Sequence, residues 1–277
     1  MKLRILSTVS LCVLVFLSLF FYQQFGALIL IALVSGFTQY ELYKLWEDLE
    51  LTPIIGAGVL IGSVCLLSPI LVGISLAIPI LFGSFGLGTI MLTLTLFGCP
   101  NRHSFIYTLL PTLAGFILVP LSFAFLTAVV MHFGAENPAS GILLGIWILL
   151  ATKSTDVGGL FAGKFMGKNK LAPSISPGKT WEGVIGGLLL AILVSMLFYA
   201  SFRSYFPETF GYWDSLILSL LLGLVAILSD LTESIFKRMA HKKDSGQLIP
   251  GIGGIYDLSD SLLFSMPVAY GYLTLLL

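Results

Sequence analysis

Residues 182–202 read EGVIGGLLLAILVSMLFYASF and contain one charged side chain, that of Glu182. A helix needs about 20 mainly apolar residues to cross the hydrocarbon core of a bilayer. This stretch therefore predicts a membrane-spanning helix. It also decides the class of the fold, because a chain with such a helix has lipid as part of its solvent.

Other apolar runs of this kind follow one another along the chain. Hydrophobic residues make up 57% of the 277 residues, charged residues make up 10%, and the mean hydropathy is +1.01. A soluble globular domain has about 25% charged residues. We therefore predict an all-α, polytopic integral membrane protein with about nine transmembrane helices and a polar cavity that faces the cytoplasm. The remaining windows are 4–22, 25–42, 53–71, 73–97, 105–131, 139–154, 213–231 and 259–277.

Three windows have features of their own. The first lacks a small-x-small cleavage site, so we interpret it as a retained span and not as a signal peptide. The window 105–131 contains Pro111 and Pro120, which predict a kink or a split. The window 139–154 is short and runs into polar residues, so we expect this span to end inside the protein.

The basic residues indicate an orientation. With the N-terminus in the cytoplasm, 13 of the 14 Lys and Arg residues fall in cytoplasmic segments, and only Arg203 lies outside. This predicts a protein of the cell inner or plasma membrane with its active site on the cytoplasmic side. We expect two regions, with N-terminal transmembrane helices in 1–132 and a C-terminal transmembrane catalytic region in 133–277.

Polar residues concentrate in two of the predicted cytoplasmic loops, 153–182 and 229–261. These loops hold nine of the 14 basic residues and seven of the 14 acidic ones. Polar groups at membrane depth are costly, so their concentration indicates a functional site. The net charge of zero gives no general attraction for nucleic acid, and no nucleic-acid partner is expected.

The acids of these loops lie at the ends of predicted spans. Asp230 and Glu233 are three residues apart, as are Asp257 and Asp260, so each pair lies on one face of a helix. Carboxylates without His or Cys partners suit Mg²⁺, and Asp156 is a further candidate ligand. The alternative is that these acids are solvated charges at helix ends.

Glycines and cations accompany the acids. Pro250-Gly251-Ile252-Gly253-Gly254 could present backbone N–H groups to an anion, or could be a plain turn. The glycines of 159–167 and 183–187 favour close contact between helices. Ser176-Pro177-Gly178-Lys179-Thr180 is not a P-loop, because Pro173 stands where that motif needs glycine. The lysines could also be ordinary positive-inside charge.

In residue type, order and spacing, residues 153–261 resemble the phosphatidate cytidylyltransferases, also called CDP-diacylglycerol synthases. The first loop carries Asp156, Gly163-Lys164, Gly167-Lys168, Lys170-Leu171-Ala172-Pro173, Ser176-Pro177, Lys179-Thr180 and Glu182-Gly183. The second carries Ser229-Asp230-Leu231, Glu233-Ser234, Phe236-Lys237-Arg238, Lys243-Asp244-Ser245-Gly246, Pro250-Gly251, Gly253-Gly254, Asp257 and Asp260-Ser261. The chain departs from the family pattern at Ser229, Ile252 and Leu258, which puts the rate or the nucleotide preference in question.

The resemblance implies transfer of CMP from CTP to phosphatidate, with CDP-diacylglycerol and pyrophosphate as products, for phospholipid biosynthesis. It implies Mg²⁺ on Asp230, Asp257 and Asp260, as one ion or two, with Asp156 and Asp244 as further candidates. Lys237, Arg238 and Lys243 would neutralise the triphosphate. The nucleotide or the lipid phosphate would be held by Lys164, Lys168, Ser176, Lys179 and Thr180, with backbone donors from Gly251, Gly253 and Gly254. Membrane lipids are the remaining partners, and a homodimer is an open alternative.

Other classes of protein remain open at this point. A diverged family member would act on another lipid or nucleotide. A secondary transporter would also use glycines and intramembrane charge, although no repeated half is evident. A CDP-alcohol phosphotransferase or a prenyltransferase is disfavoured, because the acidic motifs of those enzymes are absent from the sequence.

Overall fold

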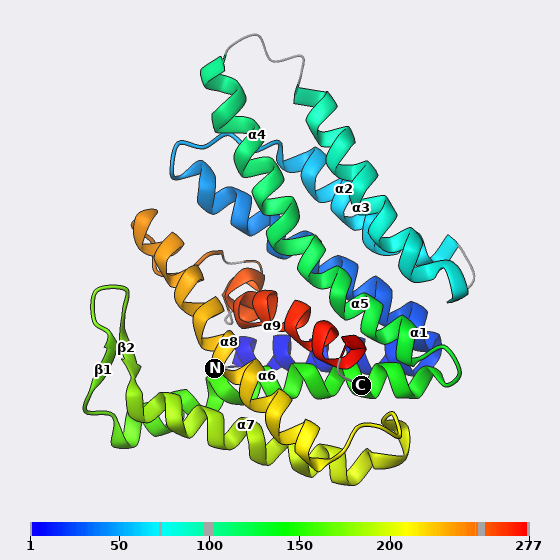
Figure 1. Ribbon diagram of the computed structural model, residues 1–277. Helices are drawn as coiled ribbons and strands as arrows, with labels where there is room; N and C mark the ends of the chain where they lie inside the picture. The colour runs from blue at the N-terminus through cyan, green and yellow to red at the C-terminus, as the bar shows by residue number, and fades with distance from the viewer. Residues whose placement is uncertain (1, 72–73, 97–101, 247, 249–252, 276–277) are drawn as a thin grey trace. The chain divides into compact units, whose positions relative to one another are not determined.

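The computed structural model describes residues 2–71, 74–96, 102–246, 248 and 253–275. Within these residues the chain is almost entirely helical, with one small β-hairpin (Figure 1). The helices are α1 (Lys2–Glu47), α2 (Ile55–Leu67), α3 (Ile74–Leu96), α4 (Arg102–Phe116), α5 (Ser122–Phe133), α6 (Pro138–Met166), α7 (Trp181–Phe202), α8 (Tyr212–Met239) and α9 (Ile255–Leu275).

Five helical segments are long and apolar enough to cross a membrane: Val13–Glu47, Ile106–Phe133, Pro138–Met166, Trp181–Tyr205 and Tyr212–Met239. The prediction of an all-α membrane protein is therefore confirmed. The number of spans stays a prediction.

The helices are interrupted at the positions that the sequence predicts, between two apolar windows and at a proline. Helix α1 runs through two of the predicted windows but has a non-helical residue, Gln23, between them. The expected break of 105–131 is a five-residue π-helical segment, Ile117–Leu121, which contains Pro120 and joins α4 to α5. Proline lacks the N–H group that an α-helix needs, so a wider turn at this position has a clear cause.

Helix α6 differs from the expectation. It does not end near residue 154 but continues to Met166. Its polar residues are accommodated inside the protein, because Thr152 and Thr155 donate their hydroxyls to Ile148 O and Ala151 O one turn earlier. The hydropathy pattern marks only the end of the apolar stretch, whereas the helix continues beyond it to Met166.

The chain divides into two compact units. The first comprises residues 1–138 and 236–259, and the second comprises 139–235 and 260–277. The core of the first unit is organised by Tyr43, which is fully buried and donates its hydroxyl to Thr112 O at 2.6 Å. Gly58 and Gly115 leave room for this ring, because a Cβ at either would lie within 2.6 Å of it.

The core of the second unit lies between α6 and α7. Trp147 on α6 is fully buried, and its Nε1 donates to Ser195 O on α7 at 3.0 Å. Tyr199, Phe206 and Phe210 add a cluster of aromatic rings at this end of α7. Aromatic side chains bury large apolar areas, so this cluster fixes the two helices at the end away from the hairpin.

The hairpin connects α6 to α7 (Figure 1). Strand β1 (Lys170–Ala172) pairs antiparallel with β2 (Ser176–Thr180), with Lys170 opposite Thr180. Thr180 caps α7 by accepting the N–H of Gly183 at 3.1 Å. Glu182, in the first turn of α7, accepts the backbone N–H groups of Lys168 and Asn169 and the Asn169 side-chain amide. The base of the hairpin is thereby fastened to α7.

Candidate functional site

A close approach of α6 and α7 sets the position of the site in the second unit. A Cβ on Gly158 would lie 2.7 Å from Gly186 O, and one on Gly183 would lie 2.8 Å from Gly159 O. Backbone atoms this close leave no room for a larger residue. The prediction that Gly159 and Gly183 allow close helix contact is confirmed.

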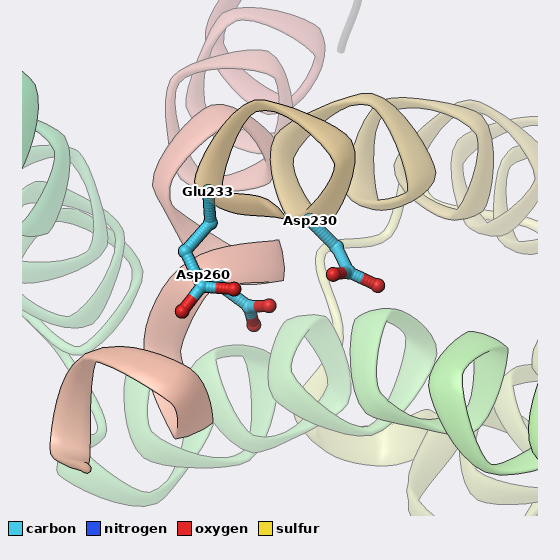
Figure 2. A group of neighbouring side chains, drawn as sticks. All are labelled: Asp230, Glu233 and Asp260. Carbon is cyan, nitrogen blue, oxygen red and sulfur yellow. The ribbon is translucent and has the colours of Figure 1, made fainter. Parts of the chain in front are cut away.

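Three acidic side chains of the second unit converge near this contact. Asp230 and Glu233 extend from α8 and Asp260 from α9, and the carboxylates point toward one another (Figure 2). One oxygen from each lies within 4.8 Å of the others. Glu233 is 1% exposed and Asp260 is 6% exposed. Buried carboxylates at such distances repel one another unless cations stand close by.

Two lysines supply positive charge to this acidic cluster of Asp230, Glu233 and Asp260. Lys179 Nζ, from β2, lies 2.5 Å from Asp230 Oδ2. Lys153 Nζ, from α6, lies 3.4 Å from Asp260 Oδ1 and 3.1 Å from Asp156 Oδ2. Helices α6, α8 and α9 and the hairpin therefore all contribute charged groups to one region of the second unit.

The serines beside Asp260 fix its orientation. Ser261 donates its backbone N–H to Asp260 Oδ1 at 2.6 Å, and Ser229 on α8 donates its hydroxyl to the Asp260 carbonyl. The Ser261 hydroxyl donates to Asp156 Oδ2 at 2.9 Å. Short hydrogen bonds to buried carboxylates hold the oxygens in defined positions.

A cavity of about 280 Å³ opens next to the cluster, between α6, the hairpin, α7 and α8. Its polar lining includes Asp156, Ser176, Lys179, Thr180 and Asp230. Its apolar lining includes Leu160, Leu171, Val184 and Ile227. A pocket with apolar walls and a few convergent polar groups is typical of a small-molecule site. Five of the predicted ligand-holding or metal-holding side chains thus line one cavity: Asp156, Ser176, Lys179, Thr180 and Asp230.

The first unit holds a second group of predicted residues around Asp257. Lys237 Nζ lies 3.0 Å from Asp257 Oδ1. The backbone N–H groups of Ser245 and Gly254 donate to the same carboxylate, at 3.1 and 3.2 Å. Gly253 has φ +125°, a conformation that side chains with a Cβ rarely adopt. Asp257 therefore organises the loop that precedes α9.

Glu41 on α1 supports this loop from within the first unit. It is 3% exposed, and its Oε2 accepts the N–H of Tyr256 at 2.8 Å. A Cβ on Gly246 or Gly254 would lie within 2.6 Å of the Glu41 carboxylate, so the two glycines leave space for it. The entry to α9 thus depends on a side chain from the N-terminal third of the sequence.

The other predicted residues are more exposed. Lys164 on α6, Lys168 before the hairpin, Arg238 on α8, Lys243 and Asp244 all have exposed side chains. Arg238 donates to Lys242 O at 3.4 Å. The oxygen of Thr180 accepts a hydrogen bond as the cap of α7. Gly251 lies outside the described residues.

Three residues were not among the predicted site residues. Glu233 joins the acidic cluster; the sequence places it with Asp230 on one helix face among the acids that suit Mg²⁺, but assigns it no role of its own. The sequence marks Lys153 only as one of the basic residues of the first loop. Glu41 is an acid within the otherwise apolar window 25–42, and an acid in such a window is itself a signal of function.

The acidic cluster suits a divalent metal ion. Its donors are all carboxylate oxygens, which Mg²⁺ prefers, and they come from two helices that hold them close together. No His or Cys belongs to the group. A divalent ion would offset the repulsion among Asp230, Glu233 and Asp260.

Comparison with known proteins finds several similar chains. A phosphatidate cytidylyltransferase of Haemophilus influenzae is 38% identical over 160 residues, covering 58% of this chain and 52% of the relative. Proteins of the same name from a Synechocystis species and Staphylococcus aureus are 42% and 38% identical, over 51% and 61% of this chain and 47% and 60% of the relatives.

The matched stretches thus span about half the length of these first relatives. The model of the cytidylyltransferase family covers residues 2–276. The chain therefore belongs to the cytidylyltransferase family.

Proposed function

We propose that this protein transfers CMP from CTP to phosphatidate, giving CDP-diacylglycerol and pyrophosphate for phospholipid biosynthesis. The observation that carries the proposal is the convergence of Asp230, Glu233 and Asp260 beside a cavity that Lys179 lines. The family membership and the names of its relatives support the same reaction.

The reaction requires an anion to approach an anion. The phosphate of phosphatidate attacks the α-phosphorus of CTP, and pyrophosphate leaves. The second pKa of a phosphate monoester is about 6, so the nucleophile needs no base near pH 7. Positioning and neutralisation of charge are therefore the main tasks of the protein.

The residues divide these tasks. Asp230, Glu233 and Asp260 would hold Mg²⁺, with Asp156 close by. Bound Mg²⁺ would polarise the phosphoryl oxygens and stabilise the charge on the leaving pyrophosphate. Lys179 and Ser176 would bind phosphate oxygens in the cavity, and Lys164 and Lys168 would add charge at its hairpin side. Lys237 and Arg238 at the end of α8, Lys243 and Asp244 after it, and Asp257 in the first turn of α9 would meet the triphosphate.

The finer architecture belongs to the proposal as well. We place about nine spans in the membrane, the N-terminus and the active site on the cytoplasmic side, and the polar cavity open to that side. Residues 133–277 would form the catalytic region and 1–132 the supporting helices. Phosphatidate would reach the cavity from the bilayer and CTP from the cytoplasm.

A transfer assay on detergent-purified protein tests the reaction. It contains phosphatidate, radiolabelled CTP and Mg²⁺, with EDTA in a parallel sample. We expect a lipid-soluble cytidine product in the Mg²⁺ sample only. Folded protein that forms no product would contradict the proposal, and substrate accumulation in proteoliposomes without nucleotide consumption would indicate a transporter.

A pair of variants connects the activity to the cluster. Asp260→Asn keeps the size of the side chain and removes its charge, and we expect turnover to fall by about 10³-fold. Glu208→Gln is the matched control, because Glu208 is exposed beyond the far end of α7. Normal turnover in folded Asp260→Asn protein would remove the cluster from the mechanism.

A further inference from the structure

Lys153 occupies a central place among the acids of the second unit. It lies on α6, one helical turn before Asp156. Its Nζ reaches Ser261 Oγ at 2.6 Å, Asp156 Oδ2 at 3.1 Å and Asp260 Oδ1 at 3.4 Å. An ammonium group has three N–H donors and no acceptor, so three oxygens use all of its capacity.

The three oxygens are also tied to one another. The Ser261 hydroxyl accepts from Lys153 and donates to Asp156 Oδ2 at 2.9 Å. Asp260 receives the Ser261 N–H on Oδ1, the oxygen that Lys153 also contacts. Lys153 therefore sets the orientation of both Asp156 and Asp260, although it comes from a different helix than Asp260.

Asp260 is the point where this network meets the acidic cluster. Its carboxylate contacts Lys153 and also lies within 4.8 Å of Asp230 and Glu233. A cation bound by the cluster would draw on the same carboxylate as the ammonium group. Like charges at such short range oppose each other strongly in a poorly solvated region.

The formal charges also indicate that Lys153 competes with a bound cation. Asp156, Asp230, Glu233 and Asp260 contribute four negative charges, and Lys153 and Lys179 contribute two positive ones. Lys153 thus offsets part of the negative charge that a divalent ion would bind. Without Lys153 the acids would carry one more uncompensated negative charge and would attract a divalent ion more strongly.

We infer that Lys153 is a positioning residue that holds Asp156 and Asp260 in place and limits the affinity of the acidic cluster for a divalent cation. The inference rests on the proposed metal site of Asp230, Glu233 and Asp260. Lys153 acts through Asp260 and needs no contact with the substrate. Moderate affinity would let the ion leave with pyrophosphate after each turnover.

Binding of Mn²⁺, measured by electron paramagnetic resonance on purified protein without nucleotide, tests the inference. Mn²⁺ takes the same oxygen ligands as Mg²⁺ and gives a direct signal for the free ion. We expect Lys153→Met to lower the Kd for Mn²⁺ by about tenfold, because the competing charge is gone. Lys153→Arg keeps the charge, so its Kd should stay within about twofold of the original.

Lys44→Met is the matched control, since Lys44 forms an exposed ion pair with Glu47 on α1. It should leave the Kd for Mn²⁺ unchanged. If Lys153→Met does not fold, Lys153→Gln gives the same test, because it keeps a hydrogen-bond donor and removes the charge. An unchanged or higher Kd in a folded neutral variant would overturn the inference, since a merely structural lysine cannot strengthen metal binding when lost.

The outcome is separable from that of the proposed function. Tighter Mn²⁺ binding in Lys153→Met, together with no CMP transfer by the unsubstituted protein, would support the role of Lys153 and contradict the reaction. Transfer activity with no Mn²⁺ binding in any variant would support the reaction and overturn the role of Lys153.

Discussion

The ammonium Nζ of Lys179, on strand β2, lies 2.5 Å from Oδ2 of Asp230, on helix α8. The pair joins the hairpin to the acidic cluster at the wall of the cavity. The two side chains are about one-quarter exposed, at 23% and 26%, but the Nζ atom of Lys179 itself is buried.

Loss of Lys179 should affect nucleotide binding and turnover together. In Lys179→Met we expect kcat/KM for CTP to fall by about 10²-fold, because a phosphate-neutralising charge is lost from the cavity. Steady-state kinetics at varied CTP measures the effect. Lys44→Met serves as the control for loss of a lysine, and unchanged kcat/KM in Lys179→Met would exclude Lys179 from substrate binding.

Loss of the Glu233 charge should weaken the binding of Mg²⁺. In Glu233→Gln we expect the Mg²⁺ concentration for half-maximal activity to rise by about tenfold, since one of three convergent carboxylates becomes neutral. The Mg²⁺ dependence of CMP transfer measures this, with Glu208→Gln as the matched control. A shift equal to that of the control would show that Glu233 only supports packing.

The close contact of α6 and α7 should not tolerate a methyl group. A Cβ on Gly187 would lie 2.5 Å from the backbone oxygen of Thr155, so Gly187→Ala must push the helices apart. We expect a loss of about 1–3 kcal/mol, seen as a lower midpoint of thermal unfolding in detergent. Gly271→Ala is the control, because nothing lies within 4 Å of a Cβ there. Equal midpoints for the two variants would contradict the close contact.

Glu41 should matter through its oxygen atoms. Glu41→Ala leaves the buried N–H of Tyr256 without its acceptor, which costs about 1–3 kcal/mol. Glu41→Gln keeps an acceptor and should recover part of the loss. Thermal unfolding of the two variants, beside the exposed Glu47→Gln, makes the comparison. If alanine and glutamine variants both unfold like the unsubstituted protein, Glu41 does not hold the entry to α9.

Much of the fold could be predicted because lipid imposes a simple length rule. The window 182–202 matches α7 within one residue at its start, and Pro120 marked the break between α4 and α5. Hydropathy could not report the end of α6, because packing against α7 and internal hydrogen bonds carry that helix beyond its apolar stretch. Strands of three and five residues without alternating polarity gave no signal for the hairpin.

The site could be predicted only where its residues are neighbours in sequence or at helix ends. Acid spacing pointed to Asp230 and Asp260. The contact of Lys153 with Asp260 spans 107 positions, and that of Glu41 with Tyr256 spans 215. Contacts over such separations depend on how the helices pack, and helix packing cannot be predicted from the pattern of a single sequence.

The fastening of the hairpin has a consequence for its motion. Glu182 holds the backbone of Lys168 and Asn169, and Trp181 N–H donates to Asn169 O at 3.0 Å. The base of the hairpin is therefore held to α7, and the turn is closed separately by the Ile175 N–H, which donates to Ala172 O at 3.2 Å. A shift of α7 would therefore carry the hairpin base, and with it Lys179, relative to Asp230 on α8.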